Sequence, residues 1–177
     1  PSLRKYILKS RQKGVTTNCL IEHFDGTIWT PNTNTCILSH DQGSLEKIFN
    51  IIKRAHQYMP PRWQPRLDRG GGSKYEMRFP EINSKIYADL ESRGDTINRL
   101  HISEAAFADP KRIKDTLEAV PIQTGRVTFE TTPNGMGNDF YFRWIEKNTY
   151  YAKLFFPWYY DDEYQLPAND VKEYTDD

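Results

Sequence analysis

The sequence has little cysteine, no long apolar run and no excess of charge, and each shortage argues against a class of protein. Its two cysteines, Cys19 and Cys36, form no Cys-x-x-Cys pair, which argues against a structural zinc site and a disulfide framework and fits a reducing cytosol. No apolar run approaches the ~18 residues that a membrane span needs. The opening PSLRKYILK is charged and resembles a strand more than a signal peptide. We therefore expect a cytoplasmic protein without a membrane segment.

Positive and negative charges balance, with 24 Lys and Arg against 24 Asp and Glu. No global positive field therefore draws the chain to nucleic acid, although local basic patches remain as candidates. One such patch is residues 59–74, MPPRWQPRLDRGGGSK, whose proline, glycine and arginine predict a long surface loop. A solvated loop is the commoner outcome for this composition, and contact with phosphate is the alternative.

What the sequence does contain is an alternation of strand and helix patterns. Runs of β-branched and aromatic residues predict strands at 4–10, 35–40, 74–79, 98–103, 126–132 and 151–156. Apolar residues at helical spacing predict helices at 44–58, 109–120 and 137–148. Ser44 is the expected N-cap of the first of these helices. This alternation indicates one α/β domain around a mainly parallel sheet.

The first motif is KSRQKGVTT, residues 9–17, which follows an apolar run and leads into a helix pattern. A strand, a tight loop ending in Gly-x-Thr and a helix form the geometry that cradles the phosphates of a nucleotide. Two positions depart from the usual phosphate-binding loop, because Lys9 stands where its first glycine belongs and Val15 where its lysine belongs. An ordinary basic turn is therefore the alternative.

The parts of this loop still suit an anion. Gly14 allows the backbone to turn its N–H groups toward a phosphate, and Thr16 has the hydroxyl at the position that normally binds Mg²⁺. Lys9, Arg11 and Lys13 provide positive charge in place of the missing lysine.

The second and third motifs also lie at the ends of predicted strands. LHISEAAF, residues 100–107, ends a short apolar run with Ser103 and Glu104, and a carboxylate there can orient water near a γ-phosphate. ETTPNGMGNDFYFRW, residues 130–144, places Thr131 and Thr132 at a strand tip, where hydroxyls can sense that phosphate. The alternatives are that Glu104 begins the next helix and that the threonines belong to a plain turn.

In this order the motifs resemble those of the ATPase domain of the large terminase subunit, the DNA-packaging motor of tailed phages. SRQKGVTT resembles that family's Walker A, LHISEAAF its Walker B with the catalytic glutamate, and TTPNG followed by DFYFRW its coupling motif. FFPWYYDDEY, residues 155–164, resembles the segment that closes this domain. The resemblance covers essentially the whole chain.

The resemblance implies a three-layer P-loop NTPase fold of the ASCE type, with helices on both faces of the sheet. It implies that ATP is bound by Ser10, Arg11, Gln12, Lys13, Gly14, Val15, Thr16 and Thr17. Mg²⁺ would be held by Thr16 and, through water, by Ser103, which replaces the Walker B aspartate. Glu104 would orient the attacking water, and Arg11 would substitute for the Walker lysine. The coupling residues would be Thr131, Thr132, Pro133 and Asn134, and Arg93 would reach the ATP of a neighbouring subunit.

The resemblance also implies the setting in which the chain works. Residues 1–160 would be the ATPase domain of a longer protein, and 161–177 would begin the linker toward a C-terminal nuclease domain outside this sequence. The acids Asp161, Asp162 and Glu163 are expected to be surface charge, with a two-metal site as the alternative. Expected partners are double-stranded DNA, the portal protein, the small terminase subunit and further copies of the chain on the procapsid. The competing hypothesis is a catalytically degenerate P-loop module that serves in DNA binding or motor assembly.

Overall fold

The computed structural model describes residues 3–68, 74–90 and 94–164, and within them seven strands form one sheet. The sheet has the order β3-β4-β2-β5-β6-β1-β7. The strands are β1 (Arg4–Lys9), β2 (Asn34–Leu38), β3 (Glu76–Phe79), β4 (Ser84–Asp89), β5 (Arg99–Ser103), β6 (Arg126–Thr131) and β7 (Ala152–Phe156). Only β3 runs antiparallel to its neighbour, so the expected mainly parallel α/β sheet is confirmed.

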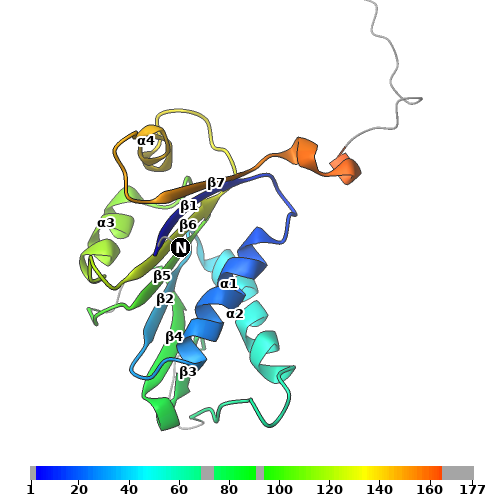
Figure 1. The fold of residues 1–177 in the computed structure, drawn as a ribbon, viewed down its shortest axis with the longest axis vertical. Coiled ribbons are helices and arrows are strands. Elements are labelled where there is room, and N and C mark those ends of the chain that lie inside the picture. The colour runs from blue at the N-terminus through cyan, green and yellow to red at the C-terminus, as the bar shows by residue number, and fades with distance from the viewer. Residues whose placement is uncertain (1–2, 69–73, 91–93, 165–177) are drawn as a thin grey trace, which may run out of the picture.

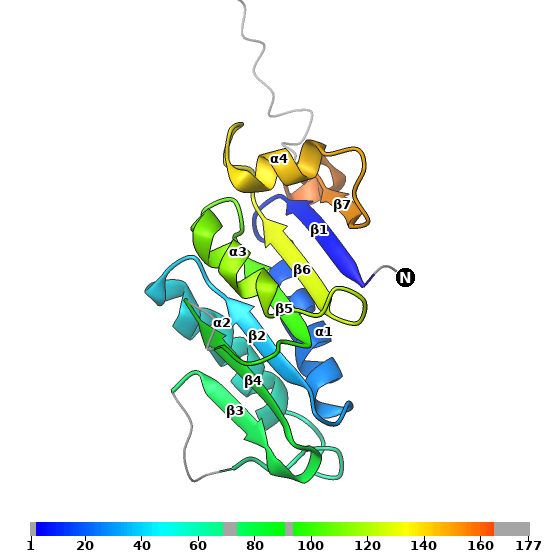
Figure 2. The same ribbon diagram turned by 90° about the vertical axis from the view of Figure 1, so that its left-hand side faces the viewer.

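Helices cover both faces of the sheet and make three layers (Figures 1 and 2). α1 (Val15–Ile28) and α2 (Gln42–Gln57) pack on one face, and α3 (Pro110–Glu118) and α4 (Asp139–Ile145) pack on the other. Each face has its own apolar core, which follows from strands buried on both sides. Three short 3₁₀ helices complete the described elements: Pro80–Ile82, Trp158–Tyr160 and Asp162–Tyr164. No helix in the described ranges is both long and apolar enough to cross a membrane.

Most differences from the sequence predictions lie at element ends, and one strand was missed. The N-cap of α2 is Asp41, whose side chain accepts the Ser44 N–H, so the prediction of Ser44 as the cap was wrong. α1 begins at Val15, inside the phosphate-loop motif, so the last three residues of the motif form its first turn. The strand β4 was not predicted, because SKIYAD is a short stretch that follows turn residues. The loop predicted at 59–74 has no helix or strand in its described residues.

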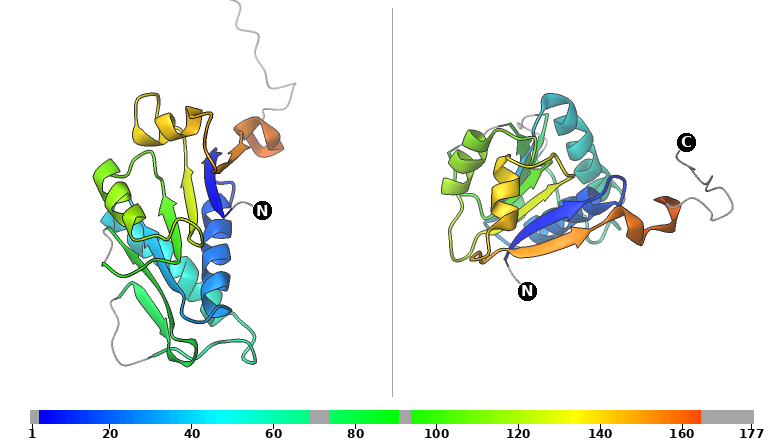
Figure 3. Two further views of the ribbon diagram at one scale, coloured as in Figure 1. Left: turned by 60° about the vertical axis from the view of Figure 1, so that its left-hand side comes forward. Right: turned by 90° about the horizontal axis from the view of Figure 1, so that it is seen from above.

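β7 forms one edge of the sheet, beside β1. Figure 3 shows this edge, with the short helices Trp158–Tyr160 and Asp162–Tyr164 continuing beyond it. Its side chains are exposed on both faces, including Leu154, Phe155 and Phe156. The edge is therefore apolar and uncovered within the described residues.

The topology brings the three sequence motifs to one end of the sheet. β5, β6 and β1 are consecutive parallel neighbours, so their carboxyl ends lie side by side. The register pairs Ser103 with Glu130 and Leu8 with Thr131. In folds of this class ligands bind outside the carboxyl ends of the strands, and that end is where these motifs meet.

Candidate active site at the carboxyl ends of the strands

The loop between β1 and α1 has the backbone of an anion-binding turn. Gln12 and Gly14 adopt positive φ angles of 56° and 69°, and the Gly14 carbonyl accepts the Asn18 N–H at 2.9 Å as α1 begins. A side chain at position 14 would meet no atom within 4 Å, so glycine is favoured there by its φ angle rather than by space. The loop therefore presents the N-terminal, electropositive end of α1. Thr16 and Thr17 lie in its first turn.

The three basic residues of this motif have different surroundings. Lys9 is only 6% exposed, at the end of β1. Lys13 forms an ion pair with Asp161 and lies 4.3 Å from the centre of the Tyr164 ring. Arg11 is exposed, and its carbonyl accepts the Tyr164 hydroxyl at 2.8 Å. Lys9 is thus a buried part of the site, while Lys13 contacts the segment that follows β7.

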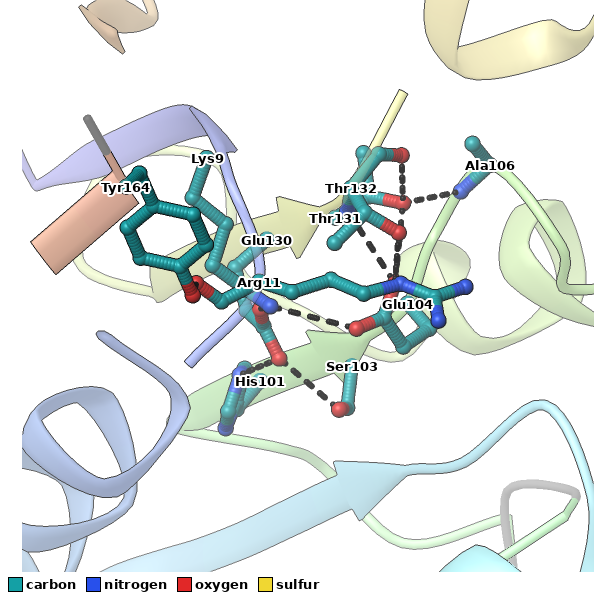
Figure 4. Close-up of polar contacts among 10 residues, drawn as sticks. All are labelled: Lys9, Arg11, His101, Ser103, Glu104, Ala106, Glu130, Thr131, Thr132 and Tyr164. Atoms are coloured by element: carbon teal, nitrogen blue, oxygen red, sulfur yellow. Dashed lines mark hydrogen bonds and ion pairs between the residues drawn. The ribbon is translucent and has the colours of Figure 1, made fainter. Parts of the chain in front are cut away.

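Lys9 joins two glutamates, one in the turn after β5 and one on β6. Its Nζ lies 3.1 Å from Glu104 Oε1 and 3.1 Å from Glu130 Oε2 (Figure 4). Burial lowers the pKa of Lys9, but the two carboxylates outweigh it and raise that pKa above its ordinary value. The amino group is therefore charged, and it links the ends of β1, β5 and β6.

Glu104 follows β5 in a turn and not in a helix, since α3 begins only at Pro110. The alternative that Glu104 starts a helix is therefore wrong. Its backbone has a φ of 51°, an uncommon conformation for a residue other than glycine. Its Oε2 accepts the N–H and the hydroxyl of Thr132, both at 3.1 Å, and faces the Thr131 hydroxyl at 3.4 Å. The carboxylate is held from β1 on one side and from the end of β6 on the other.

Behind Glu104 lies a second, fully buried carboxylate. Glu130 has no exposed surface. Its Oε1 accepts the Ser103 hydroxyl at 2.8 Å and lies 3.6 Å from Nε2 of His101. Burial raises the pKa of Glu130, but the hydrogen bonds and charges that face it outweigh burial and lower that pKa to about 2. Glu130 is thus a carboxylate anion inside the sheet.

The turn after β6 connects this cluster to α4. The Thr131 hydroxyl donates to the Thr132 carbonyl at 2.9 Å and accepts the Ala106 N–H at 3.2 Å. The Asn134 side chain donates to the Ala106 carbonyl at 2.9 Å. Asn138 then caps α4 by accepting the Tyr141 N–H. A cavity of about 270 Å³ lies beside this turn, with Thr132, Pro133 and Asn134 in its lining. The turn is therefore bonded both to the Glu104 segment and to the start of α4.

Three predicted residues stand apart from this cluster. Arg93 lies outside the described residues. Asp161 pairs with Lys13, so it is a partner of the loop and not free surface charge. Asp162 is exposed in the short helix that follows.

The sequence analysis missed Glu130 and underrated Lys9. Both are charged residues inside predicted strands, RKYILKS and RVTFETT, where apolar side chains are expected. Because a buried charge is costly unless it is paired, each was a signal that the other existed. Their pairing depends on the order of the strands, which the local sequence does not contain.

Comparisons with known proteins bear on the fold. No protein-family model and no curated protein matches the sequence. The large terminase of a thermophilic bacteriophage is 14% identical, with a TM-score of 0.70 over 95% of this chain and 43% of that one. The ATPase domain of the Thermus phage P74-26 large terminase is 16% identical, with a TM-score of 0.61 over 96% of this chain and 85% of that domain.

A third match is the large terminase of bacteriophage HK97, at 16% identity and a TM-score of 0.66 over 86% of this chain and 35% of that one. The chain thus spans less than half the length of the thermophilic-phage and HK97 terminases. Other structures of the same thermophilic-phage terminase are complexes with ATP-γ-S and with ADP. At these identities the likeness establishes the architecture: the chain has the P-loop NTPase fold of the ATPase domains of phage large terminases.

Proposed function

We propose that the chain is the ATPase domain of a large terminase, which hydrolyses ATP to drive viral double-stranded DNA into a procapsid. The observation that carries the proposal is the position of Glu104. Its carboxylate is fixed between Lys9, which ends β1 and belongs to the first motif, and Thr132, which follows β6 and belongs to the third motif. The three motifs are thus physically joined at one carboxylate, as an ATPase that couples hydrolysis to movement requires.

The phosphates of ATP would bind in the loop formed by residues 10–17. The positive φ angles of Gln12 and Gly14 and the N-terminus of α1 support this assignment. Arg11 is exposed and able to reach a ligand, and Lys9 adds a second positive charge from below the loop. Ser10 Oγ is buried and has no hydrogen-bond partner within the described residues, which fits a loop that completes its contacts with a ligand.

The oxygen donors of the site suit Mg²⁺, which prefers hydroxyl, carboxylate and water oxygens. Thr16, in the first turn of α1, would coordinate the ion directly, and Ser103 would act through a water molecule. The hydrogen bond from Ser103 to the buried Glu130 carboxylate supports this fit, because it increases the negative character of the serine oxygen. Bound Mg²⁺ would neutralise charge on the phosphate oxygens.

Glu104 would orient the water that attacks the γ-phosphate and accept its proton. It would do so once ATP had drawn Lys9 away from its Oε1. Thr131, Thr132, Pro133 and Asn134 would then transmit the state of the site to α4, since their bonds join the Glu104 segment to the start of that helix. Because this turn is bonded both to the Glu104 segment and to α4, it would shift when Glu104 exchanges Lys9 for a water molecule.

The remaining assignments concern the longer protein. Residues 1–160 would form the motor domain, and 161–177 would lead toward a nuclease domain. Double-stranded DNA, the portal protein, the small terminase subunit and other copies of the chain would be its partners, in the host cytoplasm at the procapsid vertex. Arg93 would act on the ATP of a neighbouring copy.

The competing hypothesis is a P-loop module without catalytic activity, which serves in DNA binding or assembly. The absence of the usual lysine at Val15 and of the usual aspartate at Ser103 favours it. The fixed Glu104 carboxylate favours the enzyme, because a scaffold gains nothing from a charged residue held at a φ of 51°.

A thermal-shift titration of the full-length protein with ATP and MgCl₂ separates the two hypotheses. The ATPase hypothesis expects the melting temperature to rise with nucleotide concentration and phosphate to be released on incubation. Stabilisation by ATP without phosphate release, in the presence of DNA and procapsids, would favour the module. No response to nucleotide would contradict the proposal.

A further inference from the structure

Glu130 is an unusual residue for the interior of a parallel sheet. It lies on β6, between β5 and β1, with none of its surface exposed. Removing a carboxylate from water costs several kcal/mol unless its partners compensate. The neighbouring positions on its strand, Phe129 and Thr131, are buried as well. The Glu130 carboxylate is therefore a charge retained in the core, and the residues that contact it indicate its role.

The first partner is Ser103, at the position where the Walker B aspartate is expected. The two residues are Cα partners in neighbouring strands, and the Ser103 hydroxyl donates to Glu130 Oε1 at 2.8 Å. A hydroxyl that donates to a carboxylate becomes a better acceptor for a second hydrogen bond. Ser103 and Glu130 together therefore offer the oxygen and the negative charge that one aspartate would offer.

The second partner is Lys9, which Glu130 shares with Glu104. If Glu104 turns to a water molecule, Lys9 loses one of its two carboxylates. Glu130 remains in place because its side chain is fully buried among closely packed neighbours and is held by Ser103. It therefore keeps the charge of Lys9 balanced and its amino group positioned at the end of β1.

We infer that Glu130 is a positioning residue for the metal–nucleotide complex, which supplies from β6 the negative charge that β5 lacks. It acts on Mg²⁺ through Ser103 and on the phosphates through Lys9. This inference rests on the proposed ATPase function and deepens it, because it names the carboxylate on which metal-dependent binding relies.

The test is to move the carboxylate from one strand to the other in the full-length protein. Three variants are compared with the wild type: Glu130→Gln, Ser103→Asp and the double variant Ser103→Asp/Glu130→Gln. The matched control is Glu76→Gln, because Glu76 has a side chain only 2% exposed and is paired with Arg78 on β3, away from the site. The measurement is the affinity for a fluorescent ATP analogue in MgCl₂ and in EDTA, and the ratio of the two affinities is the gain due to metal.

Glu130→Gln is expected to reduce this gain roughly tenfold, since the hydrogen bond from Ser103 and the contact with Lys9 both lose the negative charge. The double variant is expected to recover most of it, because the aspartate restores a carboxylate at the strand end. Glu76→Gln is expected to keep the full gain. A purely structural role for Glu130 predicts no such recovery, since a carboxylate at position 103 does not repair a packing defect at position 130.

Two results would overturn the inference: a full metal gain in Glu130→Gln, or a double variant no better than the single one. Should Glu130→Gln fail to fold, Ser103→Ala tests the same link with Glu130 in place, and a full gain in that variant also overturns it. The wild-type protein shows whether only the inference about Glu130 fails or the proposed ATPase function fails as well. If wild-type protein binds no nucleotide with or without Mg²⁺, the ATPase proposal falls as well.

Discussion

Thr132 contacts the same oxygen of Glu104 twice, with its backbone N–H and with its hydroxyl, each at 3.1 Å. One group belongs to the main chain and survives any substitution except proline, whereas the other belongs to the side chain. The side-chain bond can therefore be removed by substitution while the main-chain bond is kept.

The first prediction concerns Glu104. In the full-length protein Glu104→Gln should reduce ATP turnover by ~10²–10⁴-fold, because an amide cannot accept the proton of the attacking water. ATP binding should remain close to that of the wild type, measured with a fluorescent nucleotide. Glu104→Asp should also be slow, since one methylene less retracts the carboxylate from the water.

The control for this series is Glu118→Gln, at an exposed position near the end of α3, which should hydrolyse ATP normally. Turnover by Glu104→Gln near the wild-type rate would mean that another group activates the water, and the proposed mechanism would be wrong.

The second prediction ranks the basic residues of the loop. Arg11→Ala should weaken ATP binding by about tenfold or more, because an exposed guanidinium on the loop can contact phosphate directly. Lys13→Ala should have a smaller effect, since Lys13 already pairs with Asp161. Isothermal titration with ATP-γ-S measures both. Equal and small losses would assign the phosphate charge to Lys9 instead.

The third prediction uses the double contact at Thr132. Thr132→Val removes the hydroxyl bond to Glu104 but keeps the backbone bond and the shape of the side chain. We expect kcat to fall roughly tenfold with little change in KM for ATP, because one charge-assisted bond to the carboxylate proposed to orient the water is lost. Thr132→Ser keeps the hydroxyl and should retain most of the rate. A valine variant as fast as the serine variant would exclude a role for the hydroxyl.

The fourth prediction is a pH dependence of stability at Tyr6. Burial, followed by the nearby Tyr151, raises the pKa of Tyr6 to about 12 from an ordinary 10.0. The folded state thus favours the neutral phenol, so its stabilising effect is complete below pH 10 and is lost as the pH rises from about 10 to about 12.

Between these pH values the wild type should lose more free energy of unfolding than Tyr6→Phe, which has no proton to release. The difference should be on the order of 2 kcal/mol across the window, measured by urea denaturation at several pH values. Parallel curves for the two proteins would show that Tyr6 titrates normally in the fold.

The sequence allowed most of the elements to be predicted, and it placed the motifs at strand ends. Parallel strands joined by helices must bring their carboxyl ends to one edge, so residues after Lys9, Ser103 and Thr131 had to meet once those strands were neighbours. The periodic apolar residues of α2 made that helix equally predictable.

What could not be predicted depends on which strands are neighbours. Glu130 pairs with Ser103 and Lys9 only because β6 lies between β5 and β1, and no local pattern contains that order. The prediction of the N-cap of α2 was wrong because the sequence offers two candidates. Asp41 and Ser44 are both good capping residues. In the structure the helix begins after Asp41, whose side chain accepts the Ser44 N–H.

The uncovered edge at β7 has a consequence for the protein in solution. Leu154, Phe155 and Phe156 are 39%, 52% and 41% exposed along a strand whose outer side pairs with no other described strand. Apolar edges of this kind recruit strands from other molecules, so the isolated 177-residue chain should self-associate and scatter light as its concentration rises. The substitution Phe155→Lys should delay that association, because natural sheets use charges at their edges to stay monodisperse.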